Sequence, residues 1–316
     1  MHPITIAYTP EYLDWQLGSG HPTNPERARL ALELIETQAQ SSDLQVRTLV
    51  PTLDWDRLET RYLDALGTTP SAERHLASVR QGLSDEWHGR NERLGDVAGL
   101  MFLGTVDLVD RMERDAFAPA VYFNPQGAKH HAQIDRSSGF CVFNDMAWAA
   151  RHLAGRGMRV AYLDWDAHHG DGVEVMCAAD RQILTASIHD RTIFPGTRAD
   201  SDPLRGVVNV PLDAGAGDEE LLIGIDECLA QTDAWRPDVV LVACGADGLA
   251  GDPLSMLQYS LGGLEEAARR VGRMAAAKGV PVLIGGAGGY QPLTETPLAW
   301  ARTVLAITEE LGRSYA

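Results

Sequence analysis

Nine residues, DWDAHHGDG at positions 164–172, hold three carboxylates and two imidazoles directly after the apolar run RVAYL. Asp164, Asp166 and His168 alternate, so in an extended segment their side chains would point to one side, about 6–7 Å apart. Carboxylates and an imidazole are good ligands for a borderline divalent cation. The alternative is that Asp171 caps a helix and that the other polar side chains are solvated in a loop. The density of ligand-type residues favours the metal site.

Two ligands are too few for a tight site, and a second strand offers the third. Asp247 directly follows the apolar run DVVLVAC, in a glycine-rich turn that lets the backbone approach closely. Asp252, in the sequence GDP, is better explained as a turn-forming residue. The sequence therefore predicts one metal ion, with zinc favoured and ferrous iron as the alternative, bound by Asp166, His168 and Asp247.

Two further groups of side chains become functional candidates if they converge on that metal. His130 and His131 stand in tandem after the run AVYF, and a histidine held by a carboxylate can act as a general base. Tyr290 follows the glycine-rich turn of VLIGGAGGYQ, which lacks both the dinucleotide fingerprint and the Walker lysine. The turn is therefore expected to present Tyr290 over a site. The alternatives are surface-exposed histidines and a tyrosine packed at the edge of the sheet.

The elements that must position these residues alternate between apolar strands and helical patterns. Strands are predicted at 4–8, 120–123, 159–164, 183–188, 207–210, 238–244 and 281–286, and helices at 24–40, 94–114, 144–157, 218–232 and 262–279. Such alternation predicts one α/β domain over residues 1–316, in which a mostly parallel sheet is covered on both faces. Functional sites in such sheets lie beyond the carboxyl ends of the strands. The stretch 51–93 has the weakest periodicity and is expected to be irregular or short-helical.

The composition restricts the compartment and the classes of partner. A net charge of −17 argues against a direct nucleic-acid surface, whereas an acidic rim would attract a cationic substrate. The four cysteines lie far apart without a CxxC pair, which is typical of reduced thiols. The N-terminus lacks a signal-peptide pattern, and no apolar segment approaches ~18 residues. We therefore expect a cytoplasmic protein with no membrane association, and the oligomeric state stays open.

Taken together, these stretches resemble the histone deacetylase family, including bacterial deacetylases of the acetoin-utilisation type and acetylpolyamine deacetylases. The resemblance is collinear between residues 119 and 300 and is carried by HHAQIDRSSGFCVFND, YLDWDAHHGDGVE, SIHDRTIFPGT, NVPL, GADGLAGDPL and IGGAGGYQ. It implies a single three-layer, arginase-like α/β domain with a central mostly parallel sheet flanked by helices. It also implies a zinc-dependent hydrolase that removes acetyl groups from lysine side chains.

The resemblance implies a role for each candidate residue. His131 resembles the family's general base and acid, with Asp171 as its carboxylate partner. His130, with Asp164 behind it, resembles the electrostatic companion of that base. Tyr290 corresponds to the tyrosine that donates a hydrogen bond to the substrate carbonyl.

The resemblance also implies a substrate tunnel and a second ion. The positions that match the lining of a narrow acyl-lysine tunnel are Gly139, Phe140 and Phe194. A structural K⁺ or Na⁺ would be bound, partly through backbone carbonyls, by Asp164, Asp166, His168, Ser187 and Ile188.

Some positions depart from the family pattern. The tripeptide before the histidine pair is GAK, with Ala128 and Lys129, where the family usually has Gly-Gly-Leu. Leu58 stands where many relatives have a histidine. Residues 51–118 match weakly and are expected to supply much of the pocket rim, where Asp85 and Glu86 are candidates to contact the substrate.

Other functions have less support from the sequence. A dinuclear manganese ureohydrolase would need Asp-x-His-x-Asp, but Asp171 arrives one residue late and Asp247 lacks a carboxylate partner at position 249. A non-catalytic acyl-lysine-binding protein would not need Tyr290 and both histidines. The expected substrate is acetyl-lysine in a protein or peptide, and the alternative is an acetylpolyamine or another small acetylated amine.

Overall fold

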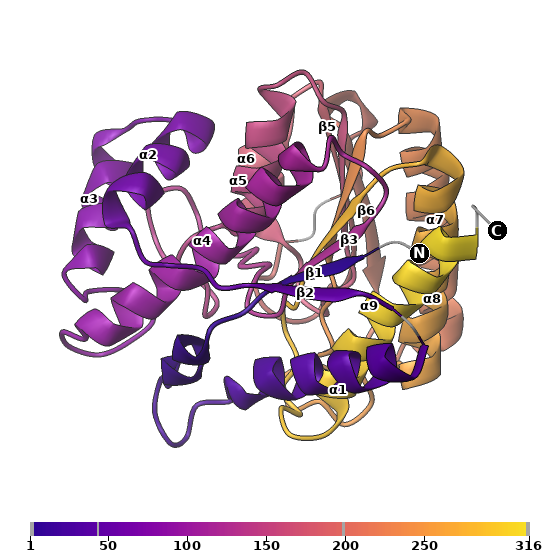
Figure 1. Cartoon of the computed structure of the whole chain (residues 1–316), viewed down its shortest axis with the longest axis horizontal. Coiled ribbons are helices and arrows are strands. Elements are labelled where there is room, and N and C mark those ends of the chain that lie inside the picture. Colours follow the sequence, from indigo (N-terminus) through magenta and orange to yellow (C-terminus); the bar gives the residue numbers. More distant parts are fainter. Residues whose placement is uncertain (1–2, 43, 198–199, 314–316) are drawn as a thin grey trace.

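A parallel sheet runs through the middle of the computed structural model, which describes residues 3–42, 44–197 and 200–313 (Figure 1). Its strand order is β2-β1-β3-β8-β7-β4-β5-β6, and each pair of neighbours is parallel. The strands are β1 (Ile4–Ala7), β2 (Val46–Leu49), β3 (Val121–Asn124), β4 (Val160–Asp164), β5 (Ile183–Asp190), β6 (Val207–Leu212), β7 (Val239–Ala243) and β8 (Val282–Gly285).

Helices cover both faces of the sheet, which gives the expected three layers. One face packs against α1 (Glu26–Ser42), α7 (Asp218–Trp235), α8 (Leu261–Lys278) and α9 (Glu295–Arg313). The other face packs against α4 (Glu92–Arg114), α5 (Asp145–Ala154) and α6 (Asp171–Cys177), with α2 (Trp55–Leu66) and α3 (Pro70–Arg80) beyond them. Two short 3₁₀ helices are η1 (Pro10–Asp14) and η2 (Pro203–Arg205). None of the helices in the described ranges combines the length and apolarity that crossing a membrane requires.

The central strands show why the sheet is buried on both sides. Every residue of β4 is buried; Leu163 belongs to the core on one face, and Val160 and Tyr162 belong to the core on the other. Successive side chains of a strand point to opposite faces, so a strand covered on both faces becomes almost continuously apolar. The run VAYL thus anchors the polar residues that follow it.

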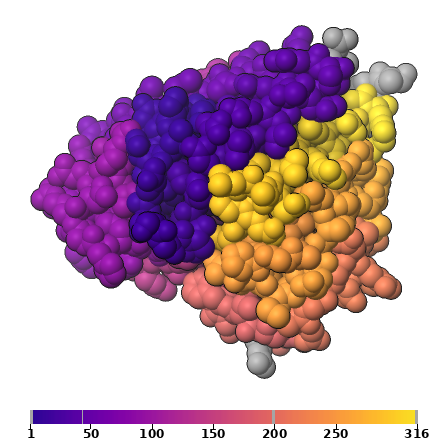
Figure 2. All heavy atoms as spheres, turned by 90° about the horizontal axis from the view of Figure 1, so that it is seen from below, coloured from indigo at the N-terminus to yellow at the C-terminus, as the bar shows by residue number. Residues whose placement is uncertain are grey.

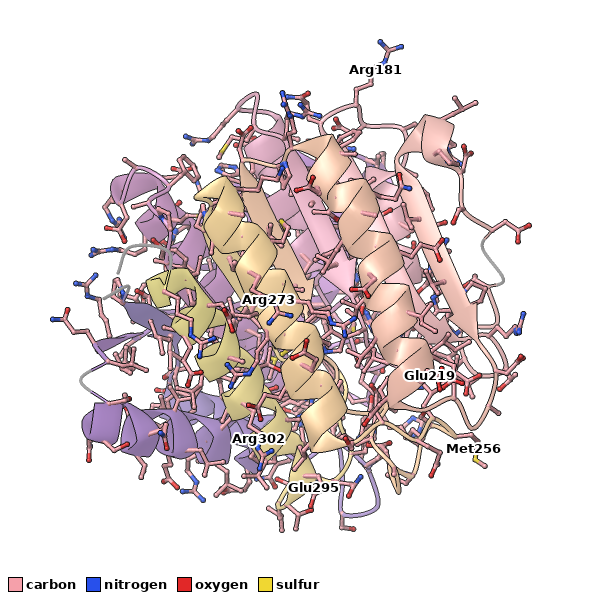
Figure 3. All side chains as sticks on the ribbon, turned by 90° about the vertical axis from the view of Figure 1, so that its right-hand side faces the viewer. Arg181, Glu219, Met256, Arg273, Glu295 and Arg302 are labelled. Carbon is pink, nitrogen blue, oxygen red and sulfur yellow. The ribbon has the colours of Figure 1, made fainter. Side chains whose placement is uncertain are left out.

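The functional residues lie at the edge where the strands end. Figure 3 places Glu219 and Glu295, near the starts of α7 and α9, at one edge of the molecule and Arg181, just before β5, at the opposite edge. Chain segments from both termini contribute to the first edge. Figure 2 shows the indigo N-terminal segment against the yellow C-terminal helix, and α1 contacts α9.

The fold class predicted from the sequence is confirmed, but several elements differ from expectation. The strand β2 and the helix α9 were not predicted. The edge strand β2 exposes Arg47 and Thr48, so it lacks the apolar run of an inner strand. Within the stretch expected to be irregular or short-helical, α2 and α3 are regular helices of 12 and 11 residues. In α2 the buried residues are few, with Leu58, Tyr62 and Leu66 at intervals of four.

Candidate active site

The three predicted metal ligands meet at the carboxyl ends of β4 and β7, which are neighbours in the sheet. Nδ1 of His168 lies 3.1 Å from Oδ1 of Asp166 and 2.8 Å from Oδ2 of Asp247. One donor atom from each residue lies within 4.8 Å of the others, and all three residues are buried. Tetrahedral zinc, with bonds of about 2.0–2.1 Å, places its ligand atoms about 3.3 Å apart. The cluster therefore fits one divalent cation.

The backbone around these ligands turns sharply instead of remaining extended. The N–H of Asp166 donates to Oδ1 of Asp164 at 2.9 Å, and the N–H of His168 donates to Oδ1 of Asp166 at 2.9 Å. The expectation that the three side chains share one side of a strand was therefore wrong. Backbone N–H groups also fix the ligands from outside, because Gly288 donates to Asp166 at 2.6 Å and Ala167 donates to Asp247 at 2.9 Å.

The electrostatics of the cluster favour a bound cation. Burial, together with the nearby Asp166 carboxylate, raises the pKa of Asp247 to about 7. Burial opposes ionisation of Asp166 too, but the His130 and His168 imidazoles outweigh it and hold its pKa well below the usual range. Hydrogen bonds to both carboxylates overcome the effect of burial on His168 and raise its pKa to about 11. Two carboxylates so close in a buried site need a cation or a shared proton between them.

The two adjacent histidines each contact a different carboxylate. Nδ1 of His131 lies 2.8 Å from Oδ1 of Asp171, and Nδ1 of His130 lies 2.8 Å from Oδ2 of Asp164. The ring centroids of the two histidines are 4.0 Å apart. Asp171 is thus the partner of a histidine and not a bridging metal ligand, which argues against the dinuclear alternative.

The two imidazoles have opposite pKa shifts. Burial would lower the pKa of His130, but the Asp164 and Asp166 carboxylates outweigh it and raise that pKa to about 9. Burial and the neighbouring His130 charge lower the pKa of His131 to about 3. His131 is therefore neutral at pH 7, and Nδ1–H donation to Asp171 leaves Nε2 free to accept a proton. Two neighbouring titratable groups whose pKa values are shifted in opposite directions are typical of acid–base catalytic sites.

A pocket of about 320 Å³ leads from the surface to these residues. Its lining contains no carboxylate, guanidinium or ammonium group and consists of His131, Gly139, Phe140, His168, Ile193, Phe194, Leu254 and Tyr290. Gly139 has a φ of 56°, and a Cβ atom there would lie 2.6 Å from Cδ2 of His131. The Phe194 ring centroid lies 4.9 Å from that of His131. Gly139, Phe140 and Phe194 thus line the pocket at the positions expected of a tunnel.

Tyr290 forms another part of the pocket wall. Its N–H donates to Oδ2 of Asp252 at 2.7 Å, and Nη1 of Arg27 donates to the carbonyl oxygen of Gly289 at 2.7 Å. Burial and the Asp247 and Asp166 carboxylates raise the pKa of the Tyr290 phenol well above 10. The hydroxyl therefore keeps its proton and is available as a donor.

Two residues expected at a monovalent-cation site, Ser187 and Ile188, lie on β5, the strand next to β4. β5 pairs with β4 so that Ser187 is the register partner of Asp164, and Ile188 is the next residue along β5. Both residues are buried. Oγ of Ser187 lies 3.0 Å from Nδ1 of His189, which belongs to the same strand.

Sequence reasoning missed several residues that hold the site in place. Tyr162 donates to Oδ2 of Asp164 at 2.6 Å, and its spacing of two residues on the same strand could have indicated this contact. Gln133 donates to Oδ2 of Asp171 at 3.1 Å. Asp252 does form a turn, by accepting the N–H of Leu254, but it also holds Tyr290. No local signal indicated the contribution of Arg27, which comes from α1.

The segment 81–95 supports the pocket from behind and does not line it. Oε2 of Glu86 accepts the N–H of Phe140 at 2.8 Å, and Trp87 donates to the carbonyl of Gly82 at 2.9 Å. The Trp87 ring packs edge-on against Trp15, with centroids 6.1 Å apart. The expectation that Glu86 contacts the substrate at the rim is not met, because its carboxylate accepts the Phe140 N–H and does not line the pocket.

Comparisons with known proteins agree with this geometry. A family model described as the histone deacetylase domain matches residues 21–307. The acetoin utilization protein AcuC of Staphylococcus aureus (strain MRSA252) is 30% identical over 324 residues, which cover 96% of this chain and 81% of that protein. AcuC of Bacillus subtilis (strain 168) is 30% identical over 323 residues with the same coverage. A solved structure titled "Crystal Structure of HDA15 HD domain" superposes with a TM-score of 0.79 at 22% identity, covering 100% of this chain and 98% of that one.

Proposed function

Because this chain belongs to the histone deacetylase family, we propose that it hydrolyses the side-chain amide of acetyl-lysine in a protein or peptide. Family membership makes the chain a deacetylase with a divalent metal, typically zinc, as cofactor. The observation that supports the lysine substrate is the pocket, whose walls are Phe140, Phe194, Ile193 and Leu254. These apolar side chains suit the four methylene groups of lysine, and the ligand cluster lies at the inner end.

The proposed reaction breaks the amide C–N bond and transfers the oxygen of a water molecule to the acyl carbon. The divalent cation, when bound, lowers the pKa of water to about 7 and polarises the carbonyl. His131, neutral and oriented by Asp171, takes the proton of the water and returns it to the departing lysine nitrogen. The positive charge of His130 favours the negative charge that develops on the carbonyl oxygen. Tyr290 donates a hydrogen bond to that oxygen, and one such donor contributes ~3–4 kcal/mol.

The lining of the pocket favours a peptide over an acetylpolyamine. A polyamine carries further ammonium groups, which would need carboxylates or other acceptors along the tunnel. The lining residues of the pocket include no carboxylate. Any selectivity for a polyamine would have to come from the surface outside the pocket, where the net charge of −17 attracts basic peptides equally.

The experiment compares kcat/KM for an acetyl-lysine peptide, free acetyl-lysine and acetylspermidine at equal ionic strength. We expect the peptide to be the best substrate, because its lysine fills the apolar pocket without leaving a charge unpaired there. A preference of 100-fold or more for acetylspermidine, about 2.7 kcal/mol in transition-state binding, would contradict the proposal.

The same proposal includes a structural K⁺ or Na⁺ beside Asp164, Asp166, His168, Ser187 and Ile188. It is supported by the register that brings Ser187 next to the ligand-bearing turn. We expect KCl to raise the melting temperature more than tetramethylammonium chloride of equal concentration. Equal melting temperatures in the two salts would argue against the monovalent ion.

A further inference from the structure

A second, smaller chamber lies behind the catalytic residues. It shares His131, Gly139, Phe140 and Tyr290 with the lysine pocket, so the two spaces meet at the reacting centre. Its remaining wall includes the metal-ligand candidate Asp166 and the side chains of Thr23, Arg27, Lys129, His130 and Cys141. The free volume of about 20 Å³ holds one or two water molecules.

This chamber lies where the acyl group of the substrate must point. In a trans amide the acyl substituent and the lysine side chain lie in the amide plane on opposite sides of the C–N bond. When lysine occupies the tunnel and the carbonyl faces Asp166, His168 and Asp247, the acyl substituent therefore continues into the chamber. The side chains of the chamber thus decide which acyl groups fit.

Two buried cations make the chamber unusual. Lys129 is 8% exposed and Arg27 is 3% exposed. In the part of the chain that the structure describes, neither has a carboxylate oxygen within 4.0 Å, and Nε of Arg27 has no hydrogen-bond partner. The Lys129 ammonium lies 6.0 Å from the ring centroid of Trp15. Burying a charge without an opposite charge is costly, so two such cations in one chamber call for an anion.

The nearest potential anions within the protein are neutral or otherwise engaged. Asp145 accepts the backbone N–H groups of Ala128 and Lys129 and the hydroxyl of Thr105. Glu86 accepts the N–H of Phe140. Burial raises the pKa of the Cys141 thiol to about 12, so it carries no charge. The carboxylates that act on Arg27 are Asp166 and Asp247, which would bind the metal, and Asp252, which accepts the N–H of Tyr290. Neither cation of the chamber therefore has a carboxylate partner of its own.

The geometry points to a further activity, which rests on the proposed function: the enzyme cleaves malonyl-lysine or succinyl-lysine amides. The terminal carboxylate of these short acyl groups binds Lys129 and Arg27. The step needs no reactant besides water. The water oxygen joins the acyl carbon, the C–N bond breaks, the lysine amine receives the proton, and the dicarboxylate leaves. The small free volume excludes long or aromatic acyl groups, whereas a carboxylate replaces the one or two water molecules that fit.

The test uses peptides that are identical except for the acyl group. Malonyl-lysine and isovaleryl-lysine have nearly the same shape, but only malonyl carries a negative charge. We expect kcat/KM of the metal-loaded enzyme to be at least 10-fold higher for malonyl-lysine, about 1.4 kcal/mol. Equal hydrolysis of the two peptides would overturn the inference, and acetyl-lysine in the same peptide shows whether the deacetylase function itself holds. A folded, metal-loaded enzyme that cleaves none of the three peptides would refute the proposed function and this inference together.

Variants of the two lysines in the chain assign the effect to the chamber. Lys129→Met keeps the length of the side chain and removes its charge. Lys278→Met is the matched control, because Lys278 ends α8 and pairs with Asp233 on the outer surface. We expect Lys129→Met to lower the malonyl-to-acetyl ratio of kcat/KM at least 10-fold, and Lys278→Met to leave the ratio unchanged. Retention of the ratio by Lys129→Met would overturn the inference.

A pH series on the wild-type enzyme provides a measurement that does not depend on any variant. Burial lowers the pKa of Lys129 to about 8, although a bound carboxylate would raise it. The charged or titratable groups that face this ammonium are Cys141, Arg27, Asp145 and Glu86. The malonyl-to-acetyl ratio cancels the pH dependence of the shared catalytic groups. We expect the ratio to fall as the pH rises from 7 to 10, and a ratio constant over this range would contradict a role for the ammonium.

Discussion

At the scale of single residues, the Tyr290 hydroxyl is the group that the proposed chemistry uses most directly. Tyr290→Phe removes only that hydroxyl, so we expect kcat for an acetyl-lysine peptide to fall by ~100-fold or more while the fold survives. Steady-state kinetics and circular dichroism check both parts.

Tyr259→Phe is the control for this substitution. The Tyr259 hydroxyl is buried without a hydrogen-bond partner among the described residues, and it is not part of the pocket wall. Its removal is expected to leave kcat unchanged. An unchanged kcat in Tyr290→Phe as well would mean that another donor stabilises the carbonyl oxygen.

At the scale of elements, loops after three different strands build the ligand cluster. Asp166 and His168 follow β4, Asp247 follows β7, and the loop after β8 closes over them through Gly288. Parallel neighbours end at the same edge, so short loops suffice to bring the ligands together. The loop after β8 approaches so closely that only glycine fits at position 288.

Gly288→Ala tests this close approach. A Cβ atom at position 288 would lie 2.3 Å from Oδ2 of Asp247 and 2.6 Å from Oδ2 of Asp166. Because both carboxylates must shift, we expect Gly288→Ala to lose most of its metal and its activity, as measured by elemental analysis and kcat/KM. Gly312→Ala in α9 is the control, since its Cβ would meet nothing within 4 Å and alanine favours a helix by up to ~1 kcal/mol. A full metal content in Gly288→Ala would mean that the loop can move away.

At the scale of the whole molecule, Lys129 links the chamber to the stability of the fold. Burial lowers its pKa from 10.5 to about 8. Between these two values the unfolded chain holds a proton that the folded chain has released, so the free energy of unfolding rises with pH over this window. Below pH 8 both states are protonated, and the buried charge costs on the order of 3 kcal/mol.

Lys129→Met is therefore expected to stabilise the protein below pH 8. It should also abolish the part of the increase in the free energy of unfolding between pH 8 and 10.5 that Lys129 causes. Urea unfolding of both proteins at several pH values, with the metal in fixed excess, measures the difference. Curves that stay parallel across this range would show that the Lys129 ammonium is not desolvated as the structure indicates. A group that lowers stability and yet lines the reacting centre is typical of a residue retained for function.

Much of the site could be predicted because each metal ligand is marked by the residues next to it in the sequence. Asp166, His168 and Asp247 each follow an apolar run that forms a strand, and the parallel arrangement follows from the alternation of strands and helices. The carboxyl ends of parallel strands share one edge, so ligand-type residues after β4 and β7 were expected to meet. The edge strand β2 escaped prediction because half of its residues face solvent.

Only the tertiary structure decided how the remaining groups combine. Besides contacting His130 as the resemblance implied, Asp164 accepts the N–H of Asp166, because the chain turns immediately after β4. Glu86 points inward to the Phe140 backbone, although its sequence surroundings are those of an exposed loop. Arg27 and Lys129, 102 positions apart in the chain, line one chamber because α1 packs against α9 and the loop after β3 closes the other side. Such contacts depend on how segments far apart in the sequence pack together. The residues next to each partner in the sequence show no pattern that would predict them.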